Sequence, residues 1–513
     1  MTHVLTNLDW IVIAVYAGLL LFICLRVAQR NPDTDELFLA GRSLGPAVIG
    51  LSLFASNISS TTLIGLPGAA WEHGIAVANY EWMAALVLLL TALYLLPRLI
   101  GSRITTIPEL LEQRFDARLR RYLSATSLFL SIVLDTAGSL YAGAIVIMLF
   151  VPELSLAPTI AALALLSGLY TYAGGLRAVA YTDVLQSIVL IAGSCLLTWL
   201  VLAELNFDIP MIIEELGPDR LSLLRPIDDP VLPWLGTLIG LPVLGFYYWT
   251  MNQYVAQRLL GARDTTAAAK GAVLAAVLKL LPLFIMVLPG AMAVLLIPEL
   301  DRPDQVFPEL IARYAPSGLA GLLIAGLLAA IMSSVDSTLN SASTLIMIDF
   351  VKPAYPKISS QSIARLGRYC TLLLMLAAAL WAPMIDHFPG LFVYLQQTFA
   401  YVTPPLVAVF LIGVSSQRVS ANAAWRGLIS GHILSFLVFI SAQLAWHNVH
   451  FTISAGLLCA ATAAFVAFWQ SLESKNTEQI SATEPDYASL SPKLRLTAYL
   501  LIGLTLLLVL LFA

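Results

Sequence analysis

Long apolar stretches follow one another along almost the whole chain, and this repetition constrains the fold more than any single motif. A helix needs about 20 apolar residues to cross a bilayer. Only 11% of the 513 residues are charged, against roughly 25% in a soluble domain. We therefore predict an all-α membrane protein with about 14 transmembrane helices, at 9–27, 44–70, 76–97, 121–150, 156–174, 178–203, 231–257, 271–298, 317–347, 366–385, 389–413, 424–444, 450–470 and 496–513.

The basic residues support this map, because Lys and Arg concentrate in loops on the cytoplasmic side of a membrane. When loops are assigned alternately to the two sides, most of the 27 Lys and Arg residues, Arg258 among them, fall in inside loops. The outside loops hold only Arg220, Arg225, Arg302 and Arg313. This distribution predicts a multi-pass protein of the plasma (inner) membrane with both termini extracytoplasmic. We interpret the first stretch as a retained helix and not as a cleaved signal.

A polar interruption lies in the middle of the second stretch, which reads "FASNISSTTLIG" at residues 53–64. Freed backbone within a bilayer is tolerated only where it faces protein or a water-filled cavity. Secondary transporters use such broken helices at the midplane to bind ions and substrate. Five stretches later, Pro242, Gly245, Asn252 and Gln253 interrupt the seventh. An alternative is that the small residues serve only close helix packing.

The two interruptions occupy matching positions, which predicts an inverted repeat of five plus five helices. We expect a single transporter domain over residues 1–513, in which one extra helix precedes the repeats and three follow them. The boundaries are 8–27 for the extra N-terminal helix, 44–203 for the first repeat, 231–413 for the second repeat and 424–513 for the C-terminal helices.

The ninth stretch presents oxygen atoms on one helix face. Ala330, Ser333 and Ser334 stand at i, i+3 and i+4, and residues at this spacing are neighbours on a helix. Neutral oxygens facing the bare carbonyls of a broken helix would suit a small hard cation without its water. Alternatively, the hydroxyls bond back to carbonyls of their own helix.

Six segments resemble the sodium/solute symporter family, and specifically its sodium/glucose cotransporter branch. They read "FLAGRSLGPAVIGLSLFASNIS", "NYEWMAA", "GGLRAVAYTDVLQS", "YYWTMNQYVAQR", "LKLLPLFIMVLPG" and "AAIMSSVDSTLNSASTLIMIDF". The similarity covers roughly residues 37 to 415. It implies a LeuT-like core and alternating access driven by a sodium gradient.

The resemblance also implies a sodium site. Its ligands would be three carbonyls and two hydroxyls, those of Ala55, Ile58, Ala330, Ser333 and Ser334. Asp183, in "YTDVLQS", matches an acidic residue that the family keeps close to this site.

For sugar-carrying members, the resemblance implies that Asn57, Glu81, Lys279 and Gln396 hold the solute and that Tyr248 is an aromatic gate. The set suits a polyol, because hydroxyl groups both donate and accept hydrogen bonds. Glu81 would accept, Lys279 would donate and the two amides would do either. Alternatively, Glu81 and Lys279 form a pair that only holds two helices together.

Four positions depart from the sugar-carrier pattern, namely Thr62, Ala84, Gly245 and Asp135. These changes reduce the neutral hydrogen-bonding groups and add a carboxylate. We therefore include Asp135 among the candidate substrate-binding residues. A cyclitol, an amino sugar or another polar solute remains an alternative to a simple sugar.

Asp336 is a further carboxylate, in "SSVDSTLNS", three residues after Ser333. Two carboxylates close together in a low dielectric need a cation or a proton between them. We hypothesise that Asp183, Asp336 and Ser337 form a second cation site, for sodium or a proton. Alternatively, Asp336 faces an inner vestibule or pairs with a cytoplasmic arginine.

These observations predict a sodium-coupled symporter for a small polar solute, a sugar or polyol, with an amino sugar, a sugar acid or another organic solute as the alternative. A sensor with the transporter fold and a separate partner is a further alternative. The six histidines show no hydrolase or metalloprotease motif, which argues against an enzyme. We expect Na⁺ as coupling ion and no organic cofactor. The expected partners are the solute, sodium and the lipid bilayer but no nucleic acid, and a monomer is compatible with this architecture.

Overall fold

The computed structural model describes residues 5–27, 33–58, 60–151, 153–173, 175–388, 391–473 and 490–512. Within these ranges every regular element is a helix, and extended pairing is limited to two isolated bridges, Leu44 with Ala262 and Arg225 with Pro233. The prediction of an all-α chain is confirmed for this part of the protein.

The α-helices of the first half are α1 (Asn7–Val27), α2 (Thr34–Leu39), α3 (Pro46–Asn57), α4 (Ser60–His73), α5 (Asn79–Leu90), α6 (Leu96–Gly101), α7 (Ile107–Arg114), α8 (Ala117–Leu130), α9 (Ala137–Phe150), α10 (Leu156–Ala173), α11 (Leu176–Glu204) and α12 (Ile209–Leu221). Those of the second half are α13 (Trp234–Ile239), α14 (Leu241–Phe246), α15 (Gln253–Leu260), α16 (Thr265–Leu278), α17 (Leu288–Leu296), α18 (Val306–Tyr314), α19 (Leu319–Leu345), α20 (Lys352–Ala354), α21 (Ser360–Trp381), α22 (Leu391–Val402), α23 (Pro404–Ser415), α24 (Ala421–Gln443), α25 (Phe451–Ser471) and α26 (Pro492–Leu511).

Short helical turns of other pitch connect or interrupt these helices. The π-helical turns are η3 (Thr91–Leu95), η4 (Ser131–Thr136), η5 (Tyr247–Met251), η6 (Leu283–Val287) and η8 (Ile346–Val351). The 3₁₀ turns are η1 (Ala40–Arg42), η2 (Ile75–Ala78), η7 (Pro303–Gln305) and η9 (Ala382–His387). Single π-helical turns inside membrane helices often mark functional sites, and two of these turns, η4 and η5, line the cavity described below.

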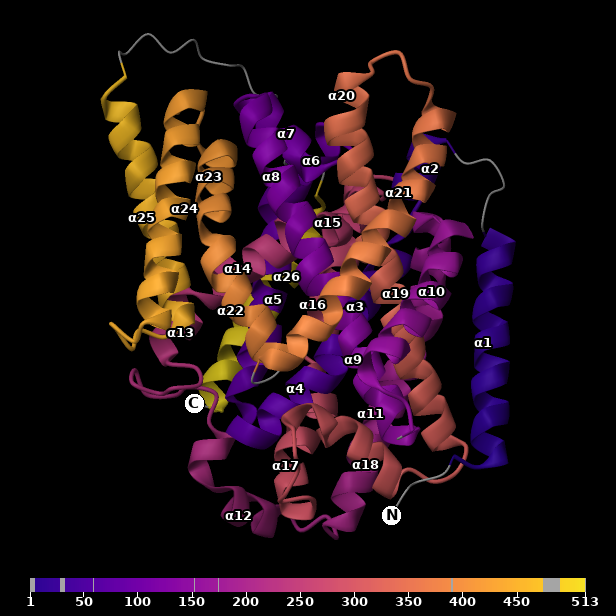
Figure 1. The fold of residues 1–513 in the computed structure, drawn as a ribbon. Coiled ribbons are helices and arrows are strands. Elements are labelled where there is room, and N and C mark those ends of the chain that lie inside the picture. The colour runs from indigo at the N-terminus through magenta and orange to yellow at the C-terminus, as the bar shows by residue number, and fades with distance from the viewer. Residues whose placement is uncertain are drawn as a thin grey trace.

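The described part of the chain contains nine helices that are long and apolar enough to cross a membrane, or up to eleven if each of two bent pairs forms one span. Asn7–Ile23 and Leu156–Gly168 are shorter apolar helices. The long helices run side by side, with α1 at one edge and α24 and α25 at the opposite edge, while α12, α17 and α18 gather at one end (Figure 1). The chain therefore has the form of a multi-pass membrane protein.

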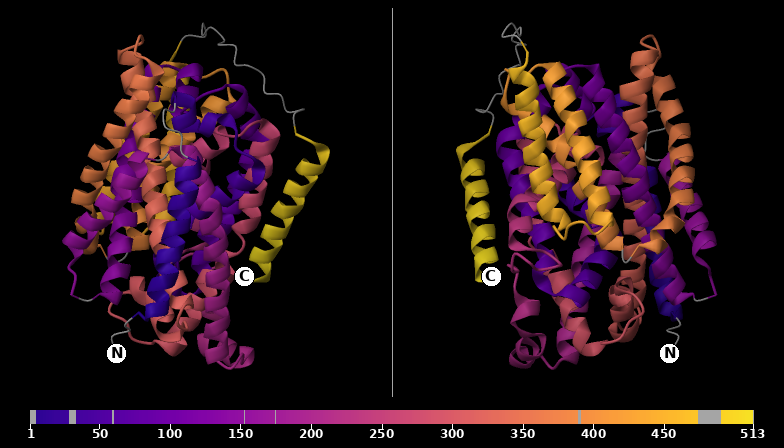
Figure 2. Two further views of the ribbon diagram at one scale, coloured as in Figure 1. Left: turned by 90° about the vertical axis from the view of Figure 1, so that its right-hand side faces the viewer. Right: turned by 60° about the vertical axis from the view of Figure 1, so that its left-hand side comes forward.

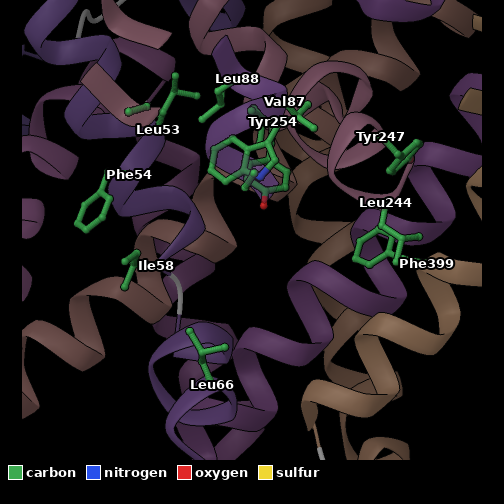
Figure 3. Packing of buried hydrophobic residues seen from close by; sticks show 14 of the residues in the cluster. Leu53, Phe54, Ile58, Leu66, Val87, Leu88, Leu244, Tyr247, Tyr254 and Phe399 are labelled. Atoms are coloured by element: carbon green, nitrogen blue, oxygen red, sulfur yellow. The ribbon is translucent and has the colours of Figure 1, made fainter. Parts of the chain in front are cut away.

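The first bent pair is α3 with α4, whose axes differ by 55°. The break follows Asn57, because Ile58 leaves the helical conformation with φ −75° and ψ 60°. Ile58 itself is fully buried, and Leu53, Phe54 and Leu66 pack around the two helix ends (Figure 3). The polar residues of "FASNISSTTLIG" thus mark an interruption, as predicted from the sequence.

The predicted interruption of the seventh stretch is also present. Asn252 stands between η5 and α15 in an extended conformation, with φ −64° and ψ 122°. Its backbone N–H donates to the carbonyl of Tyr247 at 2.7 Å, which closes a wide turn. Residues 231–257 are therefore divided among α13, α14, η5 and α15 and do not form one continuous helix.

The second bent pair is α22 with α23, at an angle of 51°. The sequence predicted one membrane span over 389–413 but not the bend within it. Pro404 and Pro405 carry no N–H group, so the carbonyls of Ala400 and Tyr401 lose their helical donors. The chain bends at Thr403, and α23 begins with the two prolines.

Helix α24 lies against this second break and supplies hydrogen bonds to it. The Ser435 hydroxyl donates to the carbonyl of Tyr401. Nε2 of His432 lies 3.1 Å from the carbonyl oxygen of Val402, and Nδ1 lies 3.2 Å from that of Leu428. A helix outside the predicted repeats therefore satisfies backbone groups of a broken span inside them.

Candidate functional site

A cavity opens where the two predicted interruptions meet. Its walls come from α3, α4, α5, η4, α9, α14, η5, α15, α19 and α22, which lie in the middle of the bundle (Figures 1 and 3). The lining residues are Ser56, Asn57, Thr62, Tyr80, Glu81, Asp135, Ser139, Leu241, Leu244, Gly245, Tyr248, Trp249, Tyr254, Ser334, Thr338, Phe392, Leu395, Gln396 and Phe399.

Five of the six candidate substrate-binding residues line this cavity, namely Asn57, Glu81, Asp135, Tyr248 and Gln396. They come from segments more than 300 residues apart in the sequence and converge only because the bundle folds. Two further departures from the sugar-carrier pattern, Thr62 and Gly245, also line the cavity. Binding of a solute by these side chains stays a prediction.

The sixth candidate, Lys279, lies behind the wall. It caps the C-terminal end of α16 and is fully buried. Its ammonium group donates to the carboxylate of Glu81, and its Nζ lies 4.9 Å from the centre of the Trp249 ring. Because a buried ammonium group needs an opposite charge, the contact with Lys279 holds Glu81 at the cavity wall.

Aromatic side chains close one side of the cavity. The hydroxyl groups of Tyr248 and Tyr254 are hydrogen-bonded to each other. The Tyr248 ring lies edge-on to those of Tyr254 and Phe399, at centroid distances of 5.8 and 6.2 Å. This contact set fits a movable barrier, so the gate role predicted for Tyr248 remains a prediction with a structural basis.

The predicted sodium ligands divide between two elements that contact each other. Ala55 and Ile58 belong to the end of α3, and Ala330, Ser333 and Ser334 lie on α19. The Ser334 hydroxyl donates to the carbonyl of Ala330 at 2.8 Å, which is the back-bonding alternative. A hydroxyl that donates its proton still offers lone pairs to a cation, so the two interpretations are compatible.

Asp183 lies beside these serines and is fully buried. Its carboxylate accepts hydrogen bonds from the hydroxyls of Ser333 and Ser52, the latter at 2.5 Å. Arg258 completes the environment, since its Nη2 lies 2.9 Å from Asp183. The position of Asp183 next to the predicted sodium ligands agrees with the resemblance.

Arg258 is the residue that the sequence placed wrongly. Assigned to an inside loop, it is instead fully buried on α15. Its guanidinium donates to the Ser52 hydroxyl at 2.6 Å, the Tyr254 carbonyl at 2.6 Å and the Ser337 hydroxyl at 2.7 Å. A basic residue near the end of a span counts as cytoplasmic by the positive-inside rule, and its partner Asp183 is too distant in the sequence to be recognised.

Arg258 occupies part of the hypothetical second cation site. Asp183 and Ser337 do approach each other, but the guanidinium of Arg258 lies between them and supplies the positive charge. Asp336 is fully buried on the same helix as Ser337. A sodium ion or proton at Asp183, Asp336 and Ser337 would share its site with Arg258, and this role stays a prediction.

Within the described residues no group of three or more His, Cys, Asp or Glu side chains could hold a metal ion. The oxygen atoms gathered at α3 and α19 are carbonyls and hydroxyls, and oxygen ligands suit hard cations. The binding of sodium at these oxygens stays a prediction.

Comparison with known proteins matches residues 37–431 to the model of the family described as sodium:solute symporter family. The chain is 33% identical to sodium/myo-inositol cotransporter 2 of Oryctolagus cuniculus over 89% of its own length and 75% of that protein. It is 32% identical to the sodium/glucose cotransporter of Vibrio parahaemolyticus, over 85% of this chain and 86% of that protein.

Among solved structures, a Na⁺-coupled sialic acid symporter in a substrate-bound outward-open state superposes with a TM-score of 0.80 at 20% identity, covering 92% of this chain and 99% of that one. Mhp1, a nucleobase-cation-symport-1 family transporter in a closed conformation, superposes with a TM-score of 0.58 at 16% identity, covering 89% of this chain and 99% of that one. These two likenesses establish a LeuT-like transporter fold.

Proposed function

The chain belongs to the sodium:solute symporter family, and we propose that it carries a small polar solute, a sugar or polyol, together with sodium by alternating access. Members of this family are transporters, so the chain is not an enzyme. The proposal rests mainly on one cavity, which is lined both by the predicted solute-binding side chains and by hydroxyl groups of α19. Ser334 lines this cavity and belongs to the predicted sodium ligands.

The architecture that we propose for transport has fourteen spans. The nine long helices, the two bent pairs, the two shorter apolar helices and the interrupted α13–α15 region together supply that number. Figure 2 supports an even number, since the first residues of α1 and the last of α26 both point toward the lower end of the molecule. We infer a 5+5 inverted repeat over 44–203 and 231–413, an inner-membrane location, extracytoplasmic termini and a monomer as the working unit.

Sodium would bind where the α3 carbonyls of Ala55 and Ile58 face Ala330, Ser333 and Ser334 on α19. Because Arg258 already balances the charge of Asp183, an ion at these neutral oxygens adds one positive charge to a neutral region. The nearby Asp336 would admit a second sodium or a proton. This second ion can be tested by measuring transport as a function of sodium concentration and pH in wild type and in Asp336→Asn. If the variant keeps the sodium cooperativity and the pH profile of wild type, Asp336 has only a structural role.

The solute would bind through complementary donors and acceptors. Glu81 accepts hydrogen bonds from hydroxyl groups, and Asn57 and Gln396 both donate and accept. Aromatic rings such as Tyr248 and Trp249 cover the apolar face of a sugar ring. Solute and sodium stabilise the same arrangement of α3 and α19, which would couple their binding.

Uptake by purified protein in proteoliposomes tests the proposal. An inward sodium gradient should drive accumulation of a labelled sugar or polyol, and Gln396→Ala should abolish it while sodium-dependent thermal stabilisation persists. Gln397→Ala, one residue further along α22 and outside the cavity lining, is the matched control and should transport normally. Binding without sodium-dependent accumulation would instead indicate a sensor.

A further inference from the structure

The charges of the cavity do not balance. Glu81 and Asp135 both contribute carboxylates to its wall, and no Lys, Arg or His is among the residues that line it. The charge of Lys279 is already matched by Glu81, with which it forms an ion pair. One negative charge, that of Asp135, is left for the contents of the cavity.

Two other buried carboxylates of the membrane-spanning helices are paired with arginine. Asp183 pairs with Arg258 at 2.9 Å, and Asp349, near the end of η8, pairs with Arg120 at 2.7 Å. Asp135 forms no ion pair within 4 Å to any Lys, Arg or His of the described ranges. Its carboxylate instead accepts a long hydrogen bond of 3.4 Å from the side-chain amide of Asn252.

An ionised carboxylate in a membrane-embedded cavity is costly unless it is compensated. Asp135 is half-buried and faces the space that a solute would fill. Asn252 cannot supply the missing charge, because an amide is neutral. A cation that comes with the bound solute or ion would supply the charge that an ionised Asp135 lacks.

The remaining walls favour an organic cation. The rings of Tyr80, Trp249, Tyr254, Phe392 and Phe399 border the same cavity. Aromatic faces attract ammonium groups within about 6 Å of the ring centre, whereas a bare sodium ion needs several oxygen ligands at once.

Building on the proposed symport function, we propose that the solute is a polyol with a protonated amine, an amino sugar or aminocyclitol, and that Asp135 binds its ammonium group. The hydroxyls of the solute would face Asn57, Glu81 and Gln396. A sugar acid is disfavoured, because its carboxylate would meet two carboxylates on the wall and no free cation.

The test is sodium-driven uptake into proteoliposomes of labelled glucosamine, its neutral analogue N-acetylglucosamine, glucose and myo-inositol. Wild type should take up glucosamine in preference to the neutral compounds by about tenfold to a hundredfold, as expected for a hydrogen bond to a charged group. Asp135→Asn should abolish that preference, and Asp135→Glu should restore part of it. Asp228→Asn, which removes an exposed carboxylate outside the cavity, is the control and should behave as wild type.

Competition in the wild type keeps the test decisive if Asp135→Asn does not fold. Unlabelled glucosamine should then inhibit uptake of any carried polyol more strongly than glucose does. Sodium-driven uptake of neutral solutes with no preference for the amine would overturn the proposal and leave sodium symport intact. A changed sodium dependence in Asp135→Asn with unchanged solute preference would also overturn it. Absence of sodium-driven uptake for every compound would overturn the proposed function itself.

Discussion

The two bent spans differ in what satisfies their freed backbone. In the α3/α4 span, the break faces the cavity and the hydroxyls of α19, and Ser56, Asn57 and Thr62 line the open space. In the α22/α23 span, Ser435 and His432 of α24 approach the carbonyls at the bend. The angles are nearly equal, 55° and 51°. A bend alone therefore does not mark a binding site, because protein groups can donate hydrogen bonds to the freed carbonyls.

The largest expected effect comes from the charges beside the first break. Asp183→Asn or Arg258→Gln leaves a buried charge without its partner, which costs about 3 to 5 kcal/mol. Each single variant should therefore lower the unfolding free energy strongly, and the double variant should lose less than the sum. Unfolding in detergent measures this.

The surface pair Arg263 with Asp264 provides the control for those variants. Its side chains are 63% and 53% exposed, and such pairs contribute little to stability. Arg263→Gln should leave the unfolding free energy nearly unchanged. Equal effects of Arg263→Gln and Arg258→Gln would contradict the assignment of Arg258 to a buried ion pair.

The next effect concerns sodium. Ser334→Ala removes one of the two hydroxyls predicted to bind the ion, and loss of such a partner costs about 1 to 3 kcal/mol. The sodium concentration for half-maximal transport should rise about fivefold or more, with little change in solute selectivity. Ser441→Ala makes the same chemical change on α24, at a hydroxyl that bonds only to its own helix outside the cavity, and should leave the sodium dependence as it was. If Ser334→Ala showed the same sodium dependence of transport as wild type, sodium would not bind at Ser334.

A smaller effect should follow at the second break. Ser435→Ala removes the donor to the Tyr401 carbonyl, and interhelical hydrogen bonds in membranes contribute about 0.6 kcal/mol on average. The unfolding free energy should fall by about that amount. Solute affinity should also weaken, because α22 carries Gln396, and Ser435→Thr should restore both. A thermal-shift titration would separate the two quantities, and unchanged solute affinity would mean that the bend does not position Gln396.

The smallest effect should come from η7, which touches both broken spans. A side chain on Gly68 of α4 would meet the Pro303 carbonyl at 2.4 Å, and the next residue, Asp304, accepts a hydrogen bond from the Leu391 backbone of α22. Burial raises the pKa of Asp304, while the Leu391 N–H group and Arg302 oppose that shift.

Because the folded pKa of Asp304 lies above the ordinary value of 3.8, the folded protein binds more protons than the unfolded chain just above that value. Stability should therefore fall as pH rises through this window. Asp304→Asn should weaken this dependence and keep the hydrogen bond to Leu391. Unfolding measured between pH 4 and neutrality checks the slope, and an identical slope in the variant would exclude Asp304 as its source.

Much of this arrangement could be predicted from the sequence. Polar residues inside an apolar stretch have few structural explanations in lipid, so Asn57 and Asn252 pointed to the breaks. The Thr403 bend was missed because Pro404 and Pro405 lie in an otherwise apolar run, and prolines are common in membrane helices. The ion pair of Arg258 with Asp183 joins residues 75 positions apart. No local pattern reveals such a contact, nor the contributions of Tyr80, Ser139, Tyr254 and Thr338 to the cavity.

The order of synthesis determines when the α22/α23 bend can form. Pro404 and Pro405 leave the ribosome before His432 and Ser435. Until α24 enters the bilayer, the Tyr401 and Val402 carbonyls would face hydrocarbon, where each unsatisfied group costs several kcal/mol. Cross-linking of ribosome-bound chains should detect the bend only in chains that extend past α24. The solute-binding position of Gln396 is therefore completed late in biosynthesis, by a helix that contributes no residue to the cavity.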